Sequence, residues 1–234
     1  MRHLKTLIND ENGSVLPITA GVIVILIAVA AVALDYARFT AASEKLKTAG
    51  DAAAVAGAVS ATRYVTLLID PGSSRDCCGD ETCNPCCVDC GDEFTVTGKE
   101  RDLIEKGGWE RYCCSCGCDK VEIIDRWVQY DDGNAEAAAQ VFFDVNIPKE
   151  MSYDQGGDSS LDSVTKYQKR GDSRYPSVVV RTAGRVKTLF LDFLNRIVPG
   201  VDFSYIKTNQ CSQGGTYYYD LNGKYHRIAG NGCN

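Results

Sequence analysis

Residues 14–63, SVLPITAGVIVILIAVAAVALDYARFTAASEKLKTAGDAAAVAGAVSATR, decide the fold of this 234-residue chain. Val15–Leu34 is a run of twenty residues without a charge, and Thr19 is its one polar side chain. At a rise of about 1.5 Å per residue, a helix over this run measures about 30 Å, the thickness of a bilayer's hydrocarbon core. Pro17 lies in the first turn, where the helix tolerates it. The sequence therefore predicts one helix over residues 14–63, whose first part crosses a membrane.

Beyond Leu34, apolar and small residues recur at alternating three- and four-residue spacing, which is the period of a helix-packing seam. The seam consists of Phe39, Ala42, Leu46, Ala49, Ala53, Ala56 and Ser60. Ala49, Ala53 and Gly57 also form a row of small residues four apart, which lets two backbones approach closely. Two partners remain open for this seam. We favour the same helix in another copy of the chain, and the alternative is the chain's own globular domain.

The segment before the helix, residues 1–13, is short, polar and mixed in charge, and is predicted to be a leader or cytoplasmic segment. A cleaved secretory signal is disfavoured because the apolar run is too long. A plain membrane anchor and a prepilin-type leader cut between Gly13 and Ser14 are the other interpretations. Basic residues flank the apolar run on both sides, so the positive-inside rule does not set its orientation.

Composition narrows the class of protein. The net charge is −6 and no basic stripe occurs, which argues against a nucleic-acid partner. The chain has 12 cysteines, an even number, placed after a membrane segment. This usage favours an oxidising exterior and places the C-terminal part outside the cytoplasm. Residues 64–234 are numerous enough to bury a core of their own, so we expect an extracytoplasmic α+β domain there.

Cysteines crowd an insertion at residues 77–118, which has too few large apolar side chains for a core and would need cross-links. The twelve cysteines form two clusters and one isolated pair. The first cluster is Cys77, Cys78, Cys83, Cys86, Cys87 and Cys90, and the second is Cys113, Cys114, Cys116 and Cys118. The isolated pair is Cys211 and Cys233.

We interpret all twelve cysteines as disulfide candidates, with Cys211 and Cys233 bonded to each other. The sequence leaves the other pairings open. A metal site is the alternative, because the spacings Cys83–Cys86, Cys87–Cys90 and Cys113–Cys116 suit two thiolates on one ion. No histidine lies near them, which disfavours metal, and a redox-active thiol pair is a third possibility.

Alternation of apolar and polar residues predicts strands at 64–70, 94–97, 121–130, 177–188 and 201–207, with a bulge or turn at Ala183-Gly184. Short helices are expected at 101–111, from Ala135 onward, and around Leu189, Phe190, Phe193 and Leu194. Residues 152–172 read as a polar surface loop or hairpin, and 216–228 as a tyrosine-rich hairpin. Two acidic groups could collect Ca²⁺ but lack EF-hand spacing, so we interpret them as solvated loops: Asp131, Asp132 and Asn134, and Asp154, Asp158 and Asp162.

Residues 13–58 resemble the N-terminal region of TadG-like and TadE-like proteins of the Flp (Tad) pilus-assembly system. That pattern has a Gly-led apolar helix, an acidic residue followed by an arginine, and an Ala-rich segment interrupted once by Asp. The matching residues are Asp35, Tyr36, Arg38, Ala49, Asp51, Ala52, Ala53, Ala54, Ala56, Gly57 and Ala58. Residues 135–148 and 178–194 resemble the same family more loosely. The resemblance implies a pseudopilin that takes part in pilus assembly.

Enzymatic motifs are missing from the sequence, and its two histidines, His3 and His226, lie near the chain ends. We therefore expect no enzyme and no cofactor. The expected function is a structural, pilin-like subunit of an extracellular filament that assembles with copies of itself or with other pilus-assembly subunits. Val15–Leu34 would hold it in the cytoplasmic membrane before assembly. The alternative is a membrane-anchored extracytoplasmic binding module whose Cys-rich part binds a metal or a surface partner.

Overall fold

The computed structural model describes residues 15–77, 85–131, 133–196, 200 and 202–233. Its two α-helices among these residues are α2 (Val15–Val59) and α3 (Asn134–Val145). The strands are β1 (Thr62–Asp70), β2 (Ser73–Cys77), β3 (Pro85–Asp89), β4 (Phe94–Lys99), β5 (Lys120–Gln129), β6 (Asp158–Tyr167), β7 (Ser177–Lys187), β8 (Tyr205–Gly215), β9 (Tyr218–Tyr219) and β10 (Tyr225–His226). Short 3-10 helices are Glu110–Tyr112, Lys149–Met151, Tyr153–Gln155 and Leu191–Arg196, and Arg101–Glu105 forms one π-helical turn.

Two compact units make up the chain, and their residues alternate along the sequence. The first unit comprises the described residues up to Ala49, Asn146–Ser160 and Thr182–Gln210. The second comprises Gly50–Val145, Leu161–Arg181 and the described residues from Cys211 onward. This division differs from a separate helical stalk followed by one domain over residues 64–234, because the second half of α2 contributes to the interior of the units.

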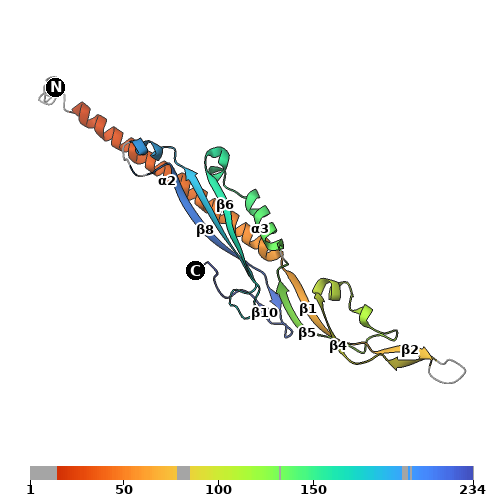
Figure 1. The fold of residues 1–234 in the computed structure, drawn as a ribbon. Coiled ribbons are helices and arrows are strands. Elements are labelled where there is room, and N and C mark those ends of the chain that lie inside the picture. Colours follow the sequence, from red (N-terminus) through yellow and green to blue (C-terminus); the bar gives the residue numbers. More distant parts are fainter. Residues whose placement is uncertain (1–14, 78–84, 132, 197–199, 201, 234) are drawn as a thin grey trace. The chain divides into compact units, whose positions relative to one another are not determined.

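The long helix is unbroken over Val15–Val59, as the sequence predicts, and Figure 1 shows α2 as one continuous coil. It ends at Val59, four residues before the predicted end at Arg63. The backbone N–H of Ser60 still bonds to the carbonyl of Ala56, and β1 begins two residues later at Thr62. The strand extends further toward the helix than its alternating pattern alone indicates.

A three-stranded antiparallel sheet with the order β4-β1-β5 organises the second unit. The predicted strand at residues 64–70 is confirmed as part of β1, in which Val65, Leu67 and Ile69 are buried. Leu103 completes this apolar cluster from the π-helical turn. The helix predicted over residues 101–111 is wrong as one element, since the backbone forms two separate short turns there. Gly107, at a φ of 67°, separates them.

A second three-stranded sheet has the order β6-β7-β8. The sequence predicts a loop or hairpin at residues 152–172, whereas the structure forms one 3-10 turn, Tyr153–Gln155, and the ten-residue strand β6 there. β6 is mostly polar and contains only Leu161 and Val164 as aliphatic residues, so its sequence carries no strand pattern. It is a strand because its backbone pairs with β7.

Strand β7 is confirmed and runs through to Lys187, so the chain makes no turn at Ala183-Gly184. The glycine has a packing reason instead. A Cβ atom at Gly184 would lie 2.5 Å from Met151 Sδ and 2.9 Å from Leu46 Cδ2. Gly184 therefore marks the place where β7 accepts a side chain of α2 in the core of the first unit.

Near the C-terminus, the tyrosine-rich hairpin is present but short. Tyr219 pairs with Tyr225, and Tyr218 with His226. The Asp220 carboxylate closes the turn by accepting hydrogen bonds from the N–H groups of Asn222 and Lys224. The strand predicted at residues 201–207 is displaced, since β8 occupies Tyr205–Gly215.

Candidate assembly interface

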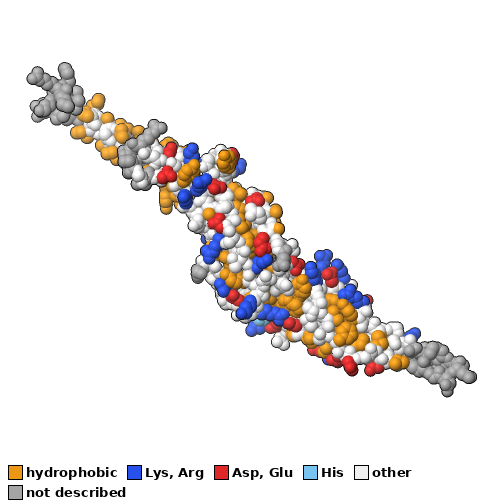
Figure 2. All heavy atoms as spheres, in the orientation of Figure 1, with side chains coloured by type: hydrophobic (Ala, Val, Ile, Leu, Met, Phe, Trp, Pro, Cys, Tyr) orange, Lys and Arg blue, Asp and Glu red, His pale blue; other side chains and the backbone are white. Residues whose placement is uncertain are grey.

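The first half of α2 exposes a continuous apolar surface. Over Val15–Leu34, the exposed fraction of the large hydrophobic side chains lies between 45% at Val32 and 79% at Leu16. Figure 2 shows hydrophobic side chains gathered on this part of the helix without charged side chains between them. Soluble monomers rarely expose an apolar patch of more than a few hundred Å². By its length and composition, the helix contains a stretch apolar enough to span a membrane.

In the second half of α2, the face that carries the predicted seam is buried within the single chain. Of the predicted seam residues, Ala42, Leu46, Ala49, Ala53 and Gly57 are buried, and Phe39 and Ala56 are half-buried. In the first unit Leu46 packs beside Gly184, as described above. The structure thus places the seam on the chain's own domain, which is the alternative that the sequence left open, rather than leaving it free for a sister helix.

The row of small residues serves the same intramolecular contact in the second unit. A Cβ atom at Gly57 would lie 3.1 Å from Val178 Cγ1 in β7 and 3.2 Å from the carbonyl oxygen of Ala135 in α3. A Cβ atom at Gly214 in β8 would overlap the backbone of Ala54. Backbones therefore approach closely, as small residues permit, but they belong to one chain.

Asp35, the first charged residue after the apolar run, is fixed by backbone N–H groups of the first unit. Its carboxylate accepts hydrogen bonds from Leu189 N at 2.9 Å, Phe190 N at 2.8 Å and Leu191 N at 2.8 Å. The residue is 2% exposed. These donors lie at the start of the 3-10 helix Leu191–Arg196, where N–H groups lack partners within the helix. Three charge-assisted bonds compensate the burial of the carboxylate.

Two of the residues that donate to Asp35, Leu189 and Phe190, carry exposed apolar side chains, and so does Phe193 in the adjoining 3-10 helix. Leu189 is 60% exposed, Phe190 42% and Phe193 46%. The sequence predicts them as the apolar face of a helix, and they do flank the 3-10 helix, but they cover no core. Sequence reasoning missed the contact with Asp35, because backbone N–H groups of any residue type can supply it.

Further polar contacts tie the second half of α2 into the first unit. Lys45 Nζ donates to Glu150 Oε1 at 2.7 Å. This hydrogen bond and the N–H of Glu150 itself hold the pKa of Glu150 below its usual value, although desolvation acts in the opposite direction. Ser43 Oγ lies 3.2 Å from Thr208 Oγ1, and Gln210 Nε2 donates to Ser43 Oγ at 2.9 Å. These contacts join α2 to the 3-10 turn at Lys149–Met151 and to β8.

Disulfides cross-link the second unit. The structure pairs Cys90 with Cys114, Cys113 with Cys118, and Cys211 with Cys233, and Cys116 is disulfide-bonded as well. The predicted Cys211–Cys233 bond is confirmed. Among the described residues no cysteine is free. Cys77 lies in β2 and Cys86 and Cys87 in β3, while Cys78 and Cys83 lie outside the described residues, as do Gly13 and Ser14.

The structure speaks against a metal site at Cys113–Cys116. Cys113 is bonded to Cys118, so it offers no thiolate to an ion at that spacing. Within the described ranges, no group of three or more His, Cys, Asp and Glu residues could hold a metal ion. Asp131, one of the residues weighed for Ca²⁺, instead accepts hydrogen bonds from Thr62, Tyr64 and Lys99 in the second unit.

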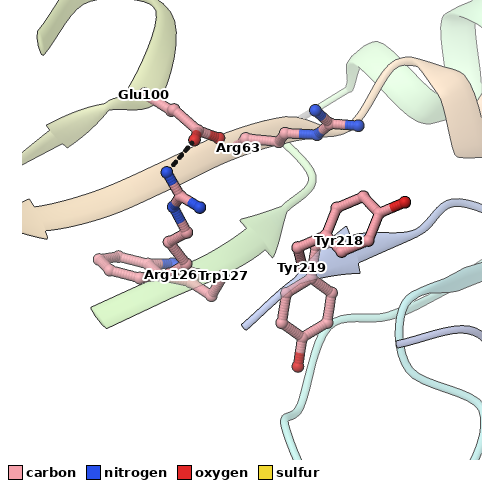
Figure 3. A pocket seen from close by; sticks show the side chains of 6 residues that line it. All are labelled: Arg63, Glu100, Arg126, Trp127, Tyr218 and Tyr219. Atoms are coloured by element: carbon pink, nitrogen blue, oxygen red, sulfur yellow. Dashed lines mark ion pairs between the residues drawn. The ribbon is translucent and has the colours of Figure 1, made fainter. Parts of the chain in front are cut away.

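A small pocket in the second unit combines aromatic and charged side chains (Figure 3). It is lined by Arg63, Glu100, Arg126, Trp127, Tyr218 and Tyr219. Arg126 Nη2 and Glu100 Oε1 lie 3.2 Å apart, so the ion pair that Figure 3 marks satisfies part of the charge. The cavity measures about 50 Å³, whereas ligand pockets usually measure about 300–1,000 Å³. Its size suits a water molecule better than an organic ligand.

The comparisons with known proteins give no relative: no family model, curated protein or solved structure matches the chain.

Proposed function

We propose that this chain is a structural, pilin-like subunit of an extracellular filament of the Flp (Tad) type, held in the cytoplasmic membrane before assembly. The observation that carries the proposal is the division of one unbroken helix into two environments. Val15–Leu34 is apolar and exposed, whereas from Ala42 onward one face of the same helix is buried in the chain's own interior. An apolar helix held in this way can move from lipid to protein without any rearrangement of the domain.

Burial of the exposed half supplies the driving force for assembly. Apolar area that leaves water contributes about 25 cal/mol per Å². Because lipid tails are as apolar as the helix, much of this gain disappears when the subunit leaves a membrane, and close packing between helices has to supply the rest. Small residues within the run, such as Gly21 and Ala28, leave room for such packing.

Disulfides support an exterior location for the domain. Bonds such as Cys90–Cys114 and Cys211–Cys233 form and persist in oxidising compartments. Among the described residues of the second unit, no helix is long enough to span a membrane, since α3 has 12 residues. A single pass through Val15–Leu34, with the disulfide-bonded part outside, satisfies both features.

Electron microscopy of material sheared from cells, with this chain identified by mass spectrometry, tests the proposal. We expect filaments that contain the chain. Gly21→Leu keeps the run apolar and leaves membrane insertion intact, but adds bulk at a position whose Cβ would have nothing within 4 Å apart from its chain neighbours and the helix's own backbone. This variant should lower the yield of filaments from cells whose membranes contain the same amount of the chain. Ala137→Leu, on the exposed side of α3, is the matched control and should leave the yield unchanged.

A membrane-anchored binding module is the second candidate. Exposed Tyr217, Tyr219 and Tyr225 favour it, since tyrosine is enriched where proteins recognise partners. A detergent extract separates the two candidates. Discrete monomers or dimers, together with sheared material that lacks the chain, would support the binding module and overturn the filament proposal.

A further inference from the structure

The exposed side chains Leu189, Phe190 and Phe193 lie beside the end of the apolar run of α2. The N–H groups of Leu189 and Phe190 bond to the carboxylate of Asp35 at 2.9 and 2.8 Å, and Asp35 directly follows Leu34. All of these residues belong to the first unit. Direct hydrogen bonds therefore hold the backbone of Leu189 and Phe190 at the end of the apolar run, and Phe193 follows in the adjoining 3-10 helix.

The contact with Asp35 sets the depth at which these side chains would lie in a membrane. If Val15–Leu34 fills a hydrocarbon core of about 30 Å, Asp35 lies at its edge. The headgroup region adds about 5–8 Å on each side. Residues whose backbone is within hydrogen-bond distance of the Asp35 side chain lie at this same level. Phe and Leu are among the side chains that interfacial protein segments bury at this depth.

The backbone N–H groups beside these side chains have hydrogen-bond partners within the protein, so they do not need water. An unpaired N–H group near lipid costs free energy, and Asp35 accepts the N–H groups of Leu189, Phe190 and Leu191. On the other side of the 3-10 helix, Asn195 Nδ2 donates to Asp192 Oδ1 and to Ser204 Oγ at 2.8 Å each. Apolar side chains are thus exposed on a segment in which the N–H groups of residues 189–191 and the Asn195 amide are bonded internally.

We infer that Leu189, Phe190 and Phe193 insert into the outer interface of the phospholipid bilayer and form a second membrane contact beside the spanning helix. This inference rests on the proposed function, in which Val15–Leu34 spans the membrane. Two contacts, one along the helix and one beside it, fix the rotation of the helix about its axis and hold the first unit against the lipid surface. The occupant of this surface is lipid, because it is continuous with the apolar run through Asp35.

Site-specific photo-crosslinking tests the inference on the full-length chain. The photoreactive amino acid p-benzoylphenylalanine replaces Phe190 in one variant and Phe193 in another, and the protein is reconstituted into phosphatidylcholine–phosphatidylglycerol vesicles. Ile25, which is 63% exposed within the apolar run, is the positive control, and Tyr153, 96% exposed elsewhere in the first unit, is the negative control. Mass spectrometry counts phospholipid adducts after illumination.

We expect lipid adducts at positions 190 and 193 in a yield severalfold above that at position 153 and comparable with that at position 25. Adducts at 25 with none at 190 or 193 would overturn the inference and leave the spanning helix intact. Cross-linked dimers at 190 without lipid adducts would also overturn it, because a second copy would then cover the surface. Absence of adducts at 25 as well would overturn both the inference and the proposed membrane stage.

Discussion

The carboxylate of Asp35 accepts a hydrogen bond of 2.8 Å from the backbone N–H of Leu191, which lies 156 residues later in the chain. Leu189 and Phe190 donate to the same carboxylate. This contact joins the point where α2 stops being uniformly apolar to the segment that follows β7. It keeps the exposed half of the helix in a defined relation to the rest of the first unit.

Replacement of Asp35 tests the strength of this contact. Asp35→Ala leaves three N–H groups without their acceptor, and the loss of one partner of a buried donor costs about 1–3 kcal/mol. We expect the free energy of unfolding to fall by about 3 kcal/mol, because the donors are partly re-solvated. Asp35→Asn keeps one acceptor oxygen and should lose about half as much. Urea unfolding in detergent micelles, followed by circular dichroism, measures both.

Asp51→Ala is the matched control, because Asp51 is an exposed acid on the same helix. It should change the free energy of unfolding by no more than about 0.5 kcal/mol. Equal stability of Asp35→Ala and Asp51→Ala would contradict the structural role of the Asp35 contact.

Gly184 makes a second prediction, on packing between α2 and β7. A Cβ atom there would meet Met151 Sδ at 2.5 Å and Leu46 Cδ2 at 2.9 Å. Gly184→Ala should therefore destabilise the chain by about 1–3 kcal/mol, which is the usual cost of overpacking a core. Gly21→Ala introduces the same methyl group where nothing lies within 4 Å apart from its chain neighbours and the helix's own backbone, and it should not destabilise the chain. A Gly184→Ala variant as stable as the parent in urea would contradict this packing.

Sequence patterns predicted the elements whose own residues carry a strong signal. The charge-free run Val15–Leu34 predicted α2, and the alternation of Val65, Leu67 and Ile69 predicted β1. The isolation of Cys211 and Cys233 from the other cysteines predicted their bond. In each case the physical cause acts locally or leaves few alternatives.

Features that depend on a partner far away in the chain could not be predicted from the sequence. Strand β6 is polar, and it is a strand because β7 offers backbone partners. The seam of α2 has a period that suits any helix-packing surface, so the pattern does not tell a sister helix from the chain's own sheet. In the sequence, Gly184 suggests an interruption of the strand, whereas in the structure the glycine leaves room for the close approach of Leu46. The donors to Asp35 are backbone N–H groups, which leave no trace in residue identity.

The Cys211–Cys233 disulfide makes a prediction about loop closure. It spans a sequence separation of 22 residues. In the chain-entropy account, removal of a disulfide that closes a loop of this size lowers the free energy of unfolding by about 3 kcal/mol. Cys211→Ser with Cys233→Ser should lower the free energy of unfolding by that amount. Cys113–Cys118 spans only 5 residues, so its double serine variant should lose about 1 kcal/mol less. An equal or reversed order in urea unfolding would contradict loop closure as the source of stability.

Asp131 makes a prediction about pH in the second unit. The Lys99 ammonium, 3.3 Å away, and the Thr62 hydroxyl, 3.1 Å away, donate to this carboxylate. These hydrogen bonds hold the pKa of Asp131 below its ordinary value of 3.8, although desolvation acts in the opposite direction. A carboxyl with a lower pKa in the folded state stabilises that state above pH 3.8, and the contribution is lost as the pH falls through the folded pKa.

We therefore expect the free energy of unfolding to decrease as the pH falls below 3.8, and Asp131→Asn to reduce this decrease. Thr62→Val removes one donor and should reduce the decrease by a smaller amount. Urea unfolding at a series of pH values, followed by the fluorescence of Trp127, measures the effect, because Trp127 stacks on Tyr64, another donor to Asp131. If Asp131→Asn kept the full pH dependence of the parent chain, the stabilising role of this carboxylate would be wrong.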